Sequence, residues 1–484
     1  MSELKAITTY QMYINGEFVH ASSNETLDVT NPATEEVISK VPKASLEDTR
    51  RAIDGSVQAQ KEWAKLPSSE RATYLFAISK EIRSNIDEYA KIISEEMGKP
   101  LDQAVVEVSV TAEYFEYIAG WARKYEGEIV PSDRENENIL VFKQPIGVVA
   151  GILPWNFPFF LIARKAAPAI LSGNTIVIKP SSVSPNNALA FAKILDKVGL
   201  PKGVINIVTG SGSVVGEELS KNEKIGMISL TGSTEAGSRV MEKASKNITK
   251  VSLELGGKAP SIVMEDADID LAVKSVLDSR IINTGQVCNC TERVYVHEDV
   301  ADEFIEKITK AMSNVSYGNP LGDEQVDMGP LSNEAGLKNV EDMVNRAVEN
   351  GATVLTGGNR VNTDAGYYYE PTVLTNVDNS FEIMKEEVFG PVLPIATFTS
   401  LDEAIELAND CQYGLTSAIF TNNVNYMMRA SNELEFGETY VNRESFEAIQ
   451  GFHAGWKKSG IGGADGKHGL EEFLQTHVVY IQYK

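Results

Sequence analysis

The chain has 484 residues, 43% of them hydrophobic and 23% charged, which is the composition of a globular protein with two or three lobes. Asp and Glu number 68 against 44 Lys and Arg, so the net charge at pH 7 is -24. A surface this acidic repels nucleic acids and anionic membranes, and we expect neither as a partner.

The first part of the chain, to about Gly120, is expected to form long amphipathic helices. Apolar residues recur at helical spacing from Leu46 to Lys65 and from Ser69 to Met97. The first 18 residues contain no basic stretch followed by an apolar run, so no signal peptide is expected.

Beyond Gly120 the chain changes to short apolar segments that alternate with helical ones. The segments GVVAGIL, NTIVIKP, VINIVTG and KIGMISLTG are rich in β-formers and end in turn residues. Helical stretches such as NNALAFAKILDKVG lie between them, and this alternation predicts a parallel α/β sheet. The longest apolar zone, residues 148–170, is interrupted by a glycine and three prolines, so no membrane helix is expected.

A second alternating series begins after Glu254, with VYVHED, ADEFIEKITKAM, VEDMVNRAVENGATVL and DEAIELAND. Two successive series predict two doubly wound α/β lobes with a cleft between them. The polar, strand-like segment RKYEGEIVPSDRENENILVFKQP interrupts the first series. Together with the C-terminal THVVYIQYK it is predicted to form a protruding arm that contacts another subunit.

Two glycine-rich segments could hold a phosphorylated ligand. INIVTGSGSVVGEEL resembles a dinucleotide fingerprint, but Gly216 lies one residue too far along, and a plain βα turn is equally compatible. In LTGSTEAGSRVMEKA, strand residues lead through Gly232 and Ser233 into a helix whose free N–H groups and dipole suit a pyrophosphate. An ordinary Ser/Thr N-cap would use the same residues.

The three cysteines are Cys288, Cys290 and Cys411, too few for a disulfide framework, which favours a cytoplasmic location. Two of them lie in GQVCNC, a loop where an accessible thiol of low pKa would be a nucleophile. Most free cysteines are instead inert small hydrophobes. The spacing fits neither a Cys-x-x-Cys pair nor a zinc site, so no metal is expected, and no histidine lies near this loop in sequence.

Two further polar residues lie in apolar surroundings. Glu254, in KVSLELGGKAP, is expected to have a raised pKa and to act as a general base, unless it is a satisfied buried carboxylate or an exposed edge residue. Asn156, in GILPWNFPFF, is held rigidly enough to donate to an oxyanion, although an Asn beside Pro is also common in simple turns.

The order and spacing of these motifs resemble the aldehyde dehydrogenase family. PWNFP, IVIKPS, TGSTEAG, LELGGKAP, GQVCNC and EEVFGPV occur in the family's order, and the likeness runs from YINGEF and NPATEEVI to GWKKSGIGG. The resemblance implies an aldehyde dehydrogenase-like α/β fold with two doubly wound α/β domains and a β oligomerisation arm. The expected division is 1–120 and 144–253 for the cofactor-binding domain, 254–450 for the catalytic domain, and 121–143 and 472–484 for the arm.

The resemblance also implies catalytic residues. Cys288, two residues after GQ, corresponds to the nucleophile that forms a thiohemiacetal with a small aldehyde. The Asn156 amide and the Cys288 backbone N–H resemble the family's oxyanion hole. After hydride transfer a thioester remains on Cys288, and Glu254 resembles the base that activates the hydrolytic water.

The implied cofactor is NAD, with NADP as the alternative. Lys179 resembles the lysine that contacts the adenosine ribose, Ser233 the pyrophosphate site, and Glu387 with Phe389 the nicotinamide site. Many NAD-preferring members have Glu where this chain has Ser182, so selectivity against a 2′-phosphate is expected to be weak. The full set of expected cofactor-binding residues is Trp155, Lys179, Ser182, Gly232, Ser233, Leu255, Glu387 and Phe389.

Within the family, NFPFFLIARKAAPA, VCNCTERVYV and NRESFEAIQGFHAGWKKSGIGGADGKHG resemble the branch that oxidises lactaldehyde. This implies that Arg164, Asn289, Glu447 and His453 line the substrate pocket and bind the hydroxyl of a short 2-hydroxyaldehyde such as lactaldehyde or glycolaldehyde. Arg164 could instead be a helix ion-pair partner, and Glu447 and His453 could only order a loop.

Other activities are weighed against this one. A succinate-semialdehyde or other semialdehyde dehydrogenase is the nearest alternative. A CoA-acylating enzyme is disfavoured by Glu254, since a deacylating base is needed when water is the acceptor. A non-enzymic structural protein would be expected to lack Cys288 or Glu254. The arm implies a homodimer or a homotetramer.

Overall fold

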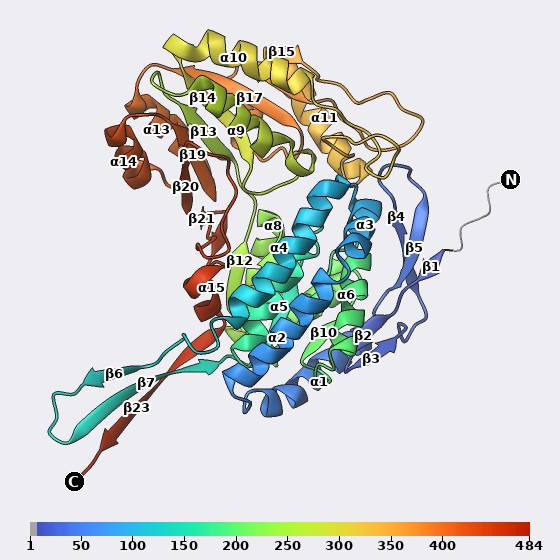
Figure 1. The fold of residues 1–484 in the computed structure, drawn as a ribbon, viewed down its shortest axis with the longest axis vertical. Coiled ribbons are helices and arrows are strands. Elements are labelled where there is room, and N and C mark those ends of the chain that lie inside the picture. The colour runs from blue at the N-terminus through green and yellow to red at the C-terminus, as the bar shows by residue number, and fades with distance from the viewer. Residues whose placement is uncertain (1–6) are drawn as a thin grey trace.

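The structure, a computed structural model, describes residues 7–484, and it contains two large sheets and a projecting smaller one (Figure 1). The first six residues of the predicted cofactor-binding domain, which also begin the segment expected to lack a signal peptide, lie outside the described residues. Two α/β lobes are present, as predicted from the alternating segments, and the fold class is confirmed.

The first sheet has eight strands in the order β22-β12-β11-β8-β9-β10-β2-β3. The five from β12 to β10 run parallel, and the strands at both edges are antiparallel. The central strands are buried because helices cover both faces, as parallel sheets require. The strands are β2 (Met12–Ile14), β3 (Glu17–Val19), β8 (Val148–Ile152), β9 (Thr175–Lys179), β10 (Ile205–Ile207), β11 (Met227–Thr231), β12 (Lys250–Glu254) and β22 (Gly460–Ile461).

Alternate residues of each strand enter different cores. Val149 and Ile176 pack in the core shared with helices α2 to α6, whereas Val148 and Val177 pack with α1, α7 and α8. This lobe is therefore doubly wound. Its helices are α1 (Leu46–Trp63), α2 (Ser68–Arg83), α3 (Ile86–Met97), α4 (Leu101–Ala119), α5 (Phe160–Leu171), α6 (Asn186–Lys197), α7 (Glu217–Lys221) and α8 (Thr234–Ala244).

The second sheet has seven strands in the order β15-β16-β17-β14-β13-β19-β20, and all except β15 run parallel. One of its cores includes α11 and α13, and the other includes α9 and α10. The elements are β13 (Ala259–Val263), α9 (Ile269–Ile281), β14 (Thr291–His297), α10 (Glu298–Ser313), α11 (Glu334–Glu349), β15 (Thr353–Thr356), β16 (Thr372–Thr375), α12 (Glu382–Lys385), β17 (Val392–Phe398), α13 (Leu401–Asn409), β19 (Thr416–Phe420), α14 (Val424–Glu433) and β20 (Glu438–Val441). Short strands β18 (Tyr413–Gly414) and β21 (Trp456–Lys457) pair beside it.

The expectation that residues before Gly120 form only helices was wrong for the first part of this segment. Strands β2 and β3 form a hairpin, and β1 (Thr8–Thr9), β5 (Val37–Pro42) and β4 (Thr26–Thr30) form a small sheet. The hairpin turn is Asn15-Gly16, with φ of 55° and 74°. Asn-Gly accepts these left-handed angles at low cost and thereby fixes a two-residue hairpin.

The predicted helix from Ser69 to Met97 is in fact two helices, α2 and α3, separated at Ser84 and Asn85. The Ser84 hydroxyl donates to the carbonyl of Lys80 at 2.9 Å, and the Asn85 amide to that of Glu81 at 2.8 Å. These side chains satisfy the carbonyls at the end of α2, which competes with continuation of the helix.

The apolar zone at residues 148–170 forms strand β8, a loop and helix α5. All twelve residues of α5 are buried, although Pro168 lies inside the helix. Among residues 7–484, no helix combines the length and the apolar character needed to span a bilayer.

The third large feature is an antiparallel sheet of β6 (Glu128–Pro131), β7 (Glu137–Pro145) and β23 (Leu474–Gln482). Strands β7 and β23 pair along nine residues, from Leu474 opposite Pro145 to Gln482 opposite Glu137. The sheet projects from the first lobe at the lower left of Figure 1. The two segments predicted to form a protruding arm thus meet in one sheet.

Candidate active site

Three adjoining cavities, which share lining residues, lie at or beside Cys288. The inner cavity, of about 300 Å3, is lined by Cys288 and by apolar side chains of α4 and α5. The middle cavity, of about 190 Å3, shares Asn156, Thr231, Glu254 and Cys288 with the inner one. Ser233 lies in the walls of both the middle cavity and the outer cavity, which has a volume of about 550 Å3. The three cavities therefore adjoin one another in a row, and Cys288 lines the inner and middle ones.

The segment carrying Cys288 follows a sharp turn after α9. Gly285, in this turn, has a φ of 73°, and its carbonyl accepts a hydrogen bond from Arg280 at 2.5 Å. The two thiols then face different environments. Cys290 is buried, with its thiol donating to the Val287 carbonyl at 2.9 Å, whereas Cys288 is half-buried and faces the inner and middle cavities. Cys288 is therefore the thiol open to a ligand.

Asn156 follows β8 and lines the inner and middle cavities beside Cys288. Its amide donates to the Gln286 carbonyl at 3.0 Å, which leaves the second amide hydrogen free. The backbone carbonyl of Asn156 accepts a hydrogen bond from the Lys99 ammonium at 2.9 Å, and Lys99 forms a buried ion pair with Glu107. The backbone N–H of Cys288 has no hydrogen-bond partner within residues 7–484, so both residues keep a donor for a ligand.

Glu254 ends β12 and is buried in the wall of the inner and middle cavities. The expectation of a raised pKa was wrong. Burial pushes the pKa up, but Lys165 and Arg164 outweigh it, with a smaller contribution from the Thr231 hydroxyl that donates to the carboxylate at 2.8 Å. The pKa therefore lies below the ordinary value, and the side chain is a carboxylate at neutral pH.

The outer cavity offers donors to an anionic ligand. Ser233 caps α8 by accepting from the Ala236 N–H at 3.2 Å, and the amino end of this eleven-residue helix faces the cavity. Lys179 is buried in the wall and donates only to the Pro180 carbonyl, at 3.1 Å. Burial lowers its pKa to about 8. An ammonium with unused donors beside a helix amino end fits a dinucleotide carrying phosphates and ribose hydroxyls.

The other predicted residues of the outer and middle cavities differ in their placement. Gly232 and Leu255 line the middle cavity. Gly216, from the less convincing glycine motif, lines the outer cavity within a π-helical turn. Ser182 is exposed three residues beyond Lys179 and is not among the residues that line the outer cavity.

Glu387, Phe389 and Trp155 also line the middle cavity. Glu387 accepts from the Gly257 N–H at 2.8 Å, and burial together with Glu292 raises its pKa to about 8. The Phe389 ring meets Trp155 edge-on, with the ring centroids 5.5 Å apart. The backbone N–H groups of Phe389 and of Val388, the residue before it, are held by further hydrogen bonds.

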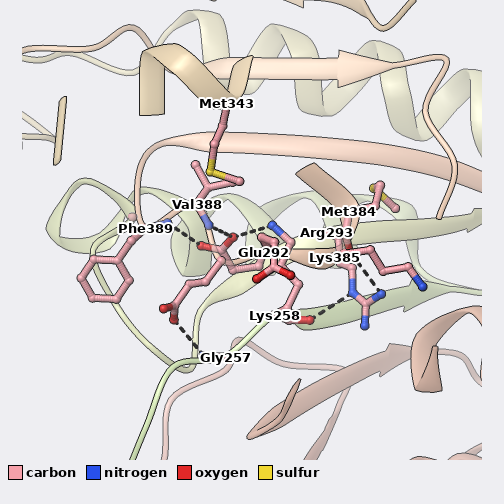
Figure 2. Close-up of polar contacts among 12 residues, drawn as sticks. Gly257, Lys258, Glu292, Arg293, Met343, Met384, Lys385, Val388 and Phe389 are labelled. Atoms are coloured by element: carbon pink, nitrogen blue, oxygen red, sulfur yellow. Dashed lines mark hydrogen bonds and ion pairs between the residues drawn. The ribbon is translucent and has the colours of Figure 1, made fainter. Parts of the chain in front are cut away.

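That support comes from the Glu292 cluster, which we define as Lys258, Arg280 and Glu292. Its carboxylate pairs with Lys258 at 2.8 Å and Arg280 at 2.9 Å, and all three side chains are excluded from solvent. Figure 2 shows Glu292 also accepting from the N–H groups of Val388, at 3.0 Å, and Phe389, at 3.2 Å. The sequence analysis missed this cluster, which joins the turn at Phe389 to the segment carrying Cys288.

Arg164 and Glu447 form a polar end of the inner cavity. With Asp465, which does not line the cavity, they make up what we define as the Arg164 cluster. Arg164 donates to Glu447 at 2.7 Å and to both oxygens of Asp465, at 3.1 and 2.7 Å. Burial would raise the pKa of Glu447, but His453 and Arg164 reverse this and bring it to about 2. Asn289 donates to the same carboxylate. The four residues predicted for the pocket, Arg164, Asn289, Glu447 and His453, therefore meet here.

The sequence of the chain shows its family. The sequence profile of the aldehyde dehydrogenase family matches residues 18–479, nearly the whole chain. The chain therefore belongs to the aldehyde dehydrogenase family and is an oxidoreductase that oxidises a small aldehyde with NAD or NADP.

Particular relatives are similar over their full length. The chain is 59% identical to the lactaldehyde dehydrogenase of Escherichia coli (strain K12), over 98% of each chain. The crystal structure of that protein superposes with a TM-score of 0.98, covering 99% of this chain and 100% of the other, at 58% identity. The D-glyceraldehyde dehydrogenase (NADP(+)) of Thermoplasma acidophilum is 40% identical, over 98% of this chain and 96% of its own.

Proposed function

We propose that the enzyme oxidises short 2-hydroxyaldehydes, such as lactaldehyde or glycolaldehyde, to their acids. The observation that carries this proposal is the polar end of an otherwise apolar inner cavity. A substrate hydroxyl can donate to Glu447 and accept from the remaining amide hydrogen of Asn289. An aldehyde without this hydroxyl leaves those groups unpaired, which costs roughly 1–3 kcal/mol per group.

The same end of the cavity disfavours semialdehydes that carry a second carboxylate. Arg164 is a cation at this end of the cavity, but it already binds Glu447 and Asp465. A further carboxylate would meet Glu447, which is ionised because its pKa is about 2. Like charges repel strongly where little water is present to screen them. We therefore rank succinate semialdehyde below lactaldehyde.

The residues that line the inner and middle cavities have different roles in this reaction. Cys288 Sγ adds to the carbonyl carbon, and the Asn156 amide with the Cys288 N–H stabilises the resulting oxyanion. Bound NAD or NADP supplies the hydride acceptor. The Glu254 carboxylate then takes a proton from the water that hydrolyses the thioester on Cys288. Because water is the acceptor, coenzyme A is not needed.

The cofactor is held, in this proposal, by Lys179 and Ser233 in the outer cavity and by Glu387 and Phe389 in the middle one. Trp155, Gly232 and Leu255 complete the walls, and Ser182 lies beyond them. NADP use is supported by the absence of a carboxylate at Ser182 and by the printed cofactor of the Thermoplasma acidophilum relative.

We further propose the domain division and assembly that the motifs imply. Residues 1–120 and 144–253 form the cofactor-binding domain and 254–450 the catalytic domain. Residues 121–143 and 472–484 form an arm that joins subunits into a homodimer or homotetramer. Its exposed apolar side chains, such as Ile129 and Tyr480, support a buried contact. A cytoplasmic location is supported by three cysteines that are all free.

The substrate proposal is tested by comparing kcat/KM for lactaldehyde, propanal and succinate semialdehyde. We expect lactaldehyde to exceed propanal by about tenfold or more, from one to two unpaired groups. Asn289→Leu is expected to lower the ratio, whereas Val106→Ala, which trims an apolar part of the same wall, is expected to leave it unchanged. Equal efficiency for lactaldehyde and propanal in the parent enzyme would refute the proposal.

A further inference from the structure

His453 has a carboxylate partner on one ring nitrogen and lines the inner cavity together with Cys288. Its Nδ1 lies 2.9 Å from a carboxylate oxygen of Glu438, a residue that the sequence analysis did not single out. The imidazole and the Cys288 thiol both line the inner cavity, where burial raises the pKa of the thiol and His453 opposes that rise. Since Nδ1 is taken by Glu438, Nε2 is the nitrogen left to face the thiol. Cys288, His453 and Glu438 therefore lie in a series of thiol, imidazole and carboxylate.

The positions of these residues are fixed by secondary structure. Glu438 begins β20, and Tyr440, two residues on and on the same face, donates its hydroxyl to the second carboxylate oxygen of Glu438. The backbone of His453 forms a β-bridge with Ala464, with N···O distances of 2.9 and 2.8 Å in the two directions. The imidazole is buried, with 2% of the His453 side chain exposed. The ring is thus held before any substrate binds.

The charges around the ring favour its protonated form. The charged groups facing it are Glu438 on β20, Glu447 in the loop after β20, Asp465 before α15 (Gly466–Glu472), Glu254 at the end of β12 and Arg164 on α5. Four carboxylates therefore surround His453 with Arg164 as the opposing cation. An imidazolium in that setting is stabilised relative to a neutral ring.

We propose that Glu438 and His453 activate Cys288 as a catalytic triad that is independent of which aldehyde is bound. The Cys288 thiol transfers its proton to Nε2 of His453, and Glu438 stabilises the imidazolium through Nδ1. The sulfur lone pair then forms the bond to the carbonyl carbon, while the C=O π electrons move to oxygen. When the thioester is hydrolysed, the sulfur leaves with its bonding pair and recovers the proton from His453. His453 is then a catalytic residue and Glu438 a positioning residue.

This proposal reverses the sign of the effect expected from simple electrostatics. A nearby carboxylate that acted on Cys288 directly would raise the thiol pKa, so its removal would speed reaction of the thiol. If Glu438 acts through His453, its removal destabilises the thiolate–imidazolium pair and slows the reaction. The direction of the change therefore separates the two accounts.

The experiment measures alkylation of Cys288 by iodoacetamide in the free enzyme, across pH, with the modified peptide identified by mass spectrometry. No aldehyde is present, so the result does not depend on the substrate proposal. Glu438→Gln and His453→Asn are expected to shift the alkylation curve to higher pH, by about one unit, which is about tenfold slower alkylation at pH 7. Glu438→Asp, whose carboxylate is one methylene shorter, is expected to shift it in the same direction.

Two variants complete the design. Glu435→Gln removes a nearby carboxylate that pairs with Lys457 at 2.6 Å and is half-exposed, and it is expected to leave the curve unchanged. In a His453→Asn background, Glu438→Gln is expected to cause no further slowing, because the residue through which it acts is gone. Faster alkylation in Glu438→Gln, or equal slowing in the presence and absence of His453, would overturn the triad.

Discussion

Two buried charge clusters contact the segment that carries Cys288, and they have opposite charge arrangements. In the Glu292 cluster one carboxylate lies between two cations, and none of these side chains lines a cavity. In the Arg164 cluster one cation lies between two carboxylates, and Arg164 and Glu447 face the inner cavity. The first cluster bonds only to protein and holds two segments in shape. The second keeps bonding capacity for a ligand.

The difference also determines what each cluster does when its central residue is lost. Without Glu292, two cations remain buried with no route for water. Without Arg164, Glu447 still borders the inner cavity, and Asp465, whose pKa burial already raises to about 6, can take up a proton. We therefore expect the Glu292 cluster to control stability and the Arg164 cluster to control substrate choice.

The largest expected effect concerns Cys288 and Cys290, because the two thiols lie in different environments. Cys290 contacts Arg280 of the Glu292 cluster at 3.2 Å, whereas Cys288 faces the inner cavity. Cys288→Ser is expected to lower kcat by about four orders of magnitude, as loss of a nucleophile does, with cofactor binding intact. Cys290→Ser is the matched control and is expected to retain most activity. Steady-state kinetics and cofactor titration provide the comparison, and equal damage from both changes would contradict the assignment.

Glu254 lies 4.0 Å from Arg164. A change at Glu254 tests whether the charged residues at the inner cavity take part in thioester hydrolysis as well as in substrate choice. Glu254→Gln keeps the shape but removes the base, so hydrolysis of the thioester is expected to slow by about 10² to 10⁴-fold. A stoichiometric burst of reduced cofactor should precede a slow steady rate. Mass spectrometry should find an acyl group on Cys288, and its absence would refute the assignment. Because the pKa of Glu254 is lowered, the parent's hydrolysis step should lose its base only as pH falls below the ordinary range of glutamate.

Glu292→Gln tests the comparison directly. Breaking a buried ion pair by removing one partner costs about 3–5 kcal/mol, and here two cations lose their shared partner. Urea denaturation should show this loss of unfolding free energy, whereas Arg164→Gln should lose less stability but lower the ratio of lactaldehyde to propanal kcat/KM. If Arg164→Gln proved the more destabilising change, the division between the clusters would be wrong.

Among residues 7–484, the wall of the outer cavity contains no buried charge cluster of this kind, and the cofactor selectivity proposed for it is expected to respond to one added charge. Ser182→Glu introduces a carboxylate near a 2′-phosphate and should raise the NAD-over-NADP ratio of kcat/KM by about tenfold, equivalent to about 1.4 kcal/mol. The parent should use NADP measurably. A parent that ignores NADP would show that another group closes the 2′ site.

The smallest expected effect is the pH dependence of cofactor binding. The pKa of Lys179 is lowered to about 8 by burial, so the ammonium is charged at pH 7 and loses its charge as the pH rises through 8. The Kd of the cofactor should therefore increase about fivefold between about pH 7 and 9. Lys179→Met should bind more weakly at pH 7 and show no such increase. A pH-dependent Kd that persists in the variant would assign it to a different group.

Much of the fold was predictable from local pattern. The alternation of apolar and helical segments identified both α/β lobes, because the period of each element is written in consecutive residues. The hairpin at Asn15-Gly16 has a recognisable turn signal, although only helices were expected before Gly120. The break at Ser84 was harder to see, because both flanking helices continue the same amphipathic pattern.

The site was predictable where residues share a motif and not where folding brings distant residues together. Cys288 and Glu254 lie in recognisable segments. Asp465 and Glu438 lie far along the chain from Arg164 and Cys288, and nothing local marks them as partners of Arg164 or His453. The sign of the Glu254 pKa shift failed for the same reason, since it depends on Lys165, which is nearly ninety residues away in sequence.

The stretch from β20 to α15 has a consequence for how such enzymes diversify. It contains Glu447, His453 and Asp465, and it is closed upon itself where the Gly466 N–H donates to the Ile449 carbonyl at 3.0 Å. Cys288 and Glu254 lie on other parts of the chain. Exchange of this one contiguous segment would therefore change the substrate pocket and the activation of Cys288 together, because His453 belongs to both.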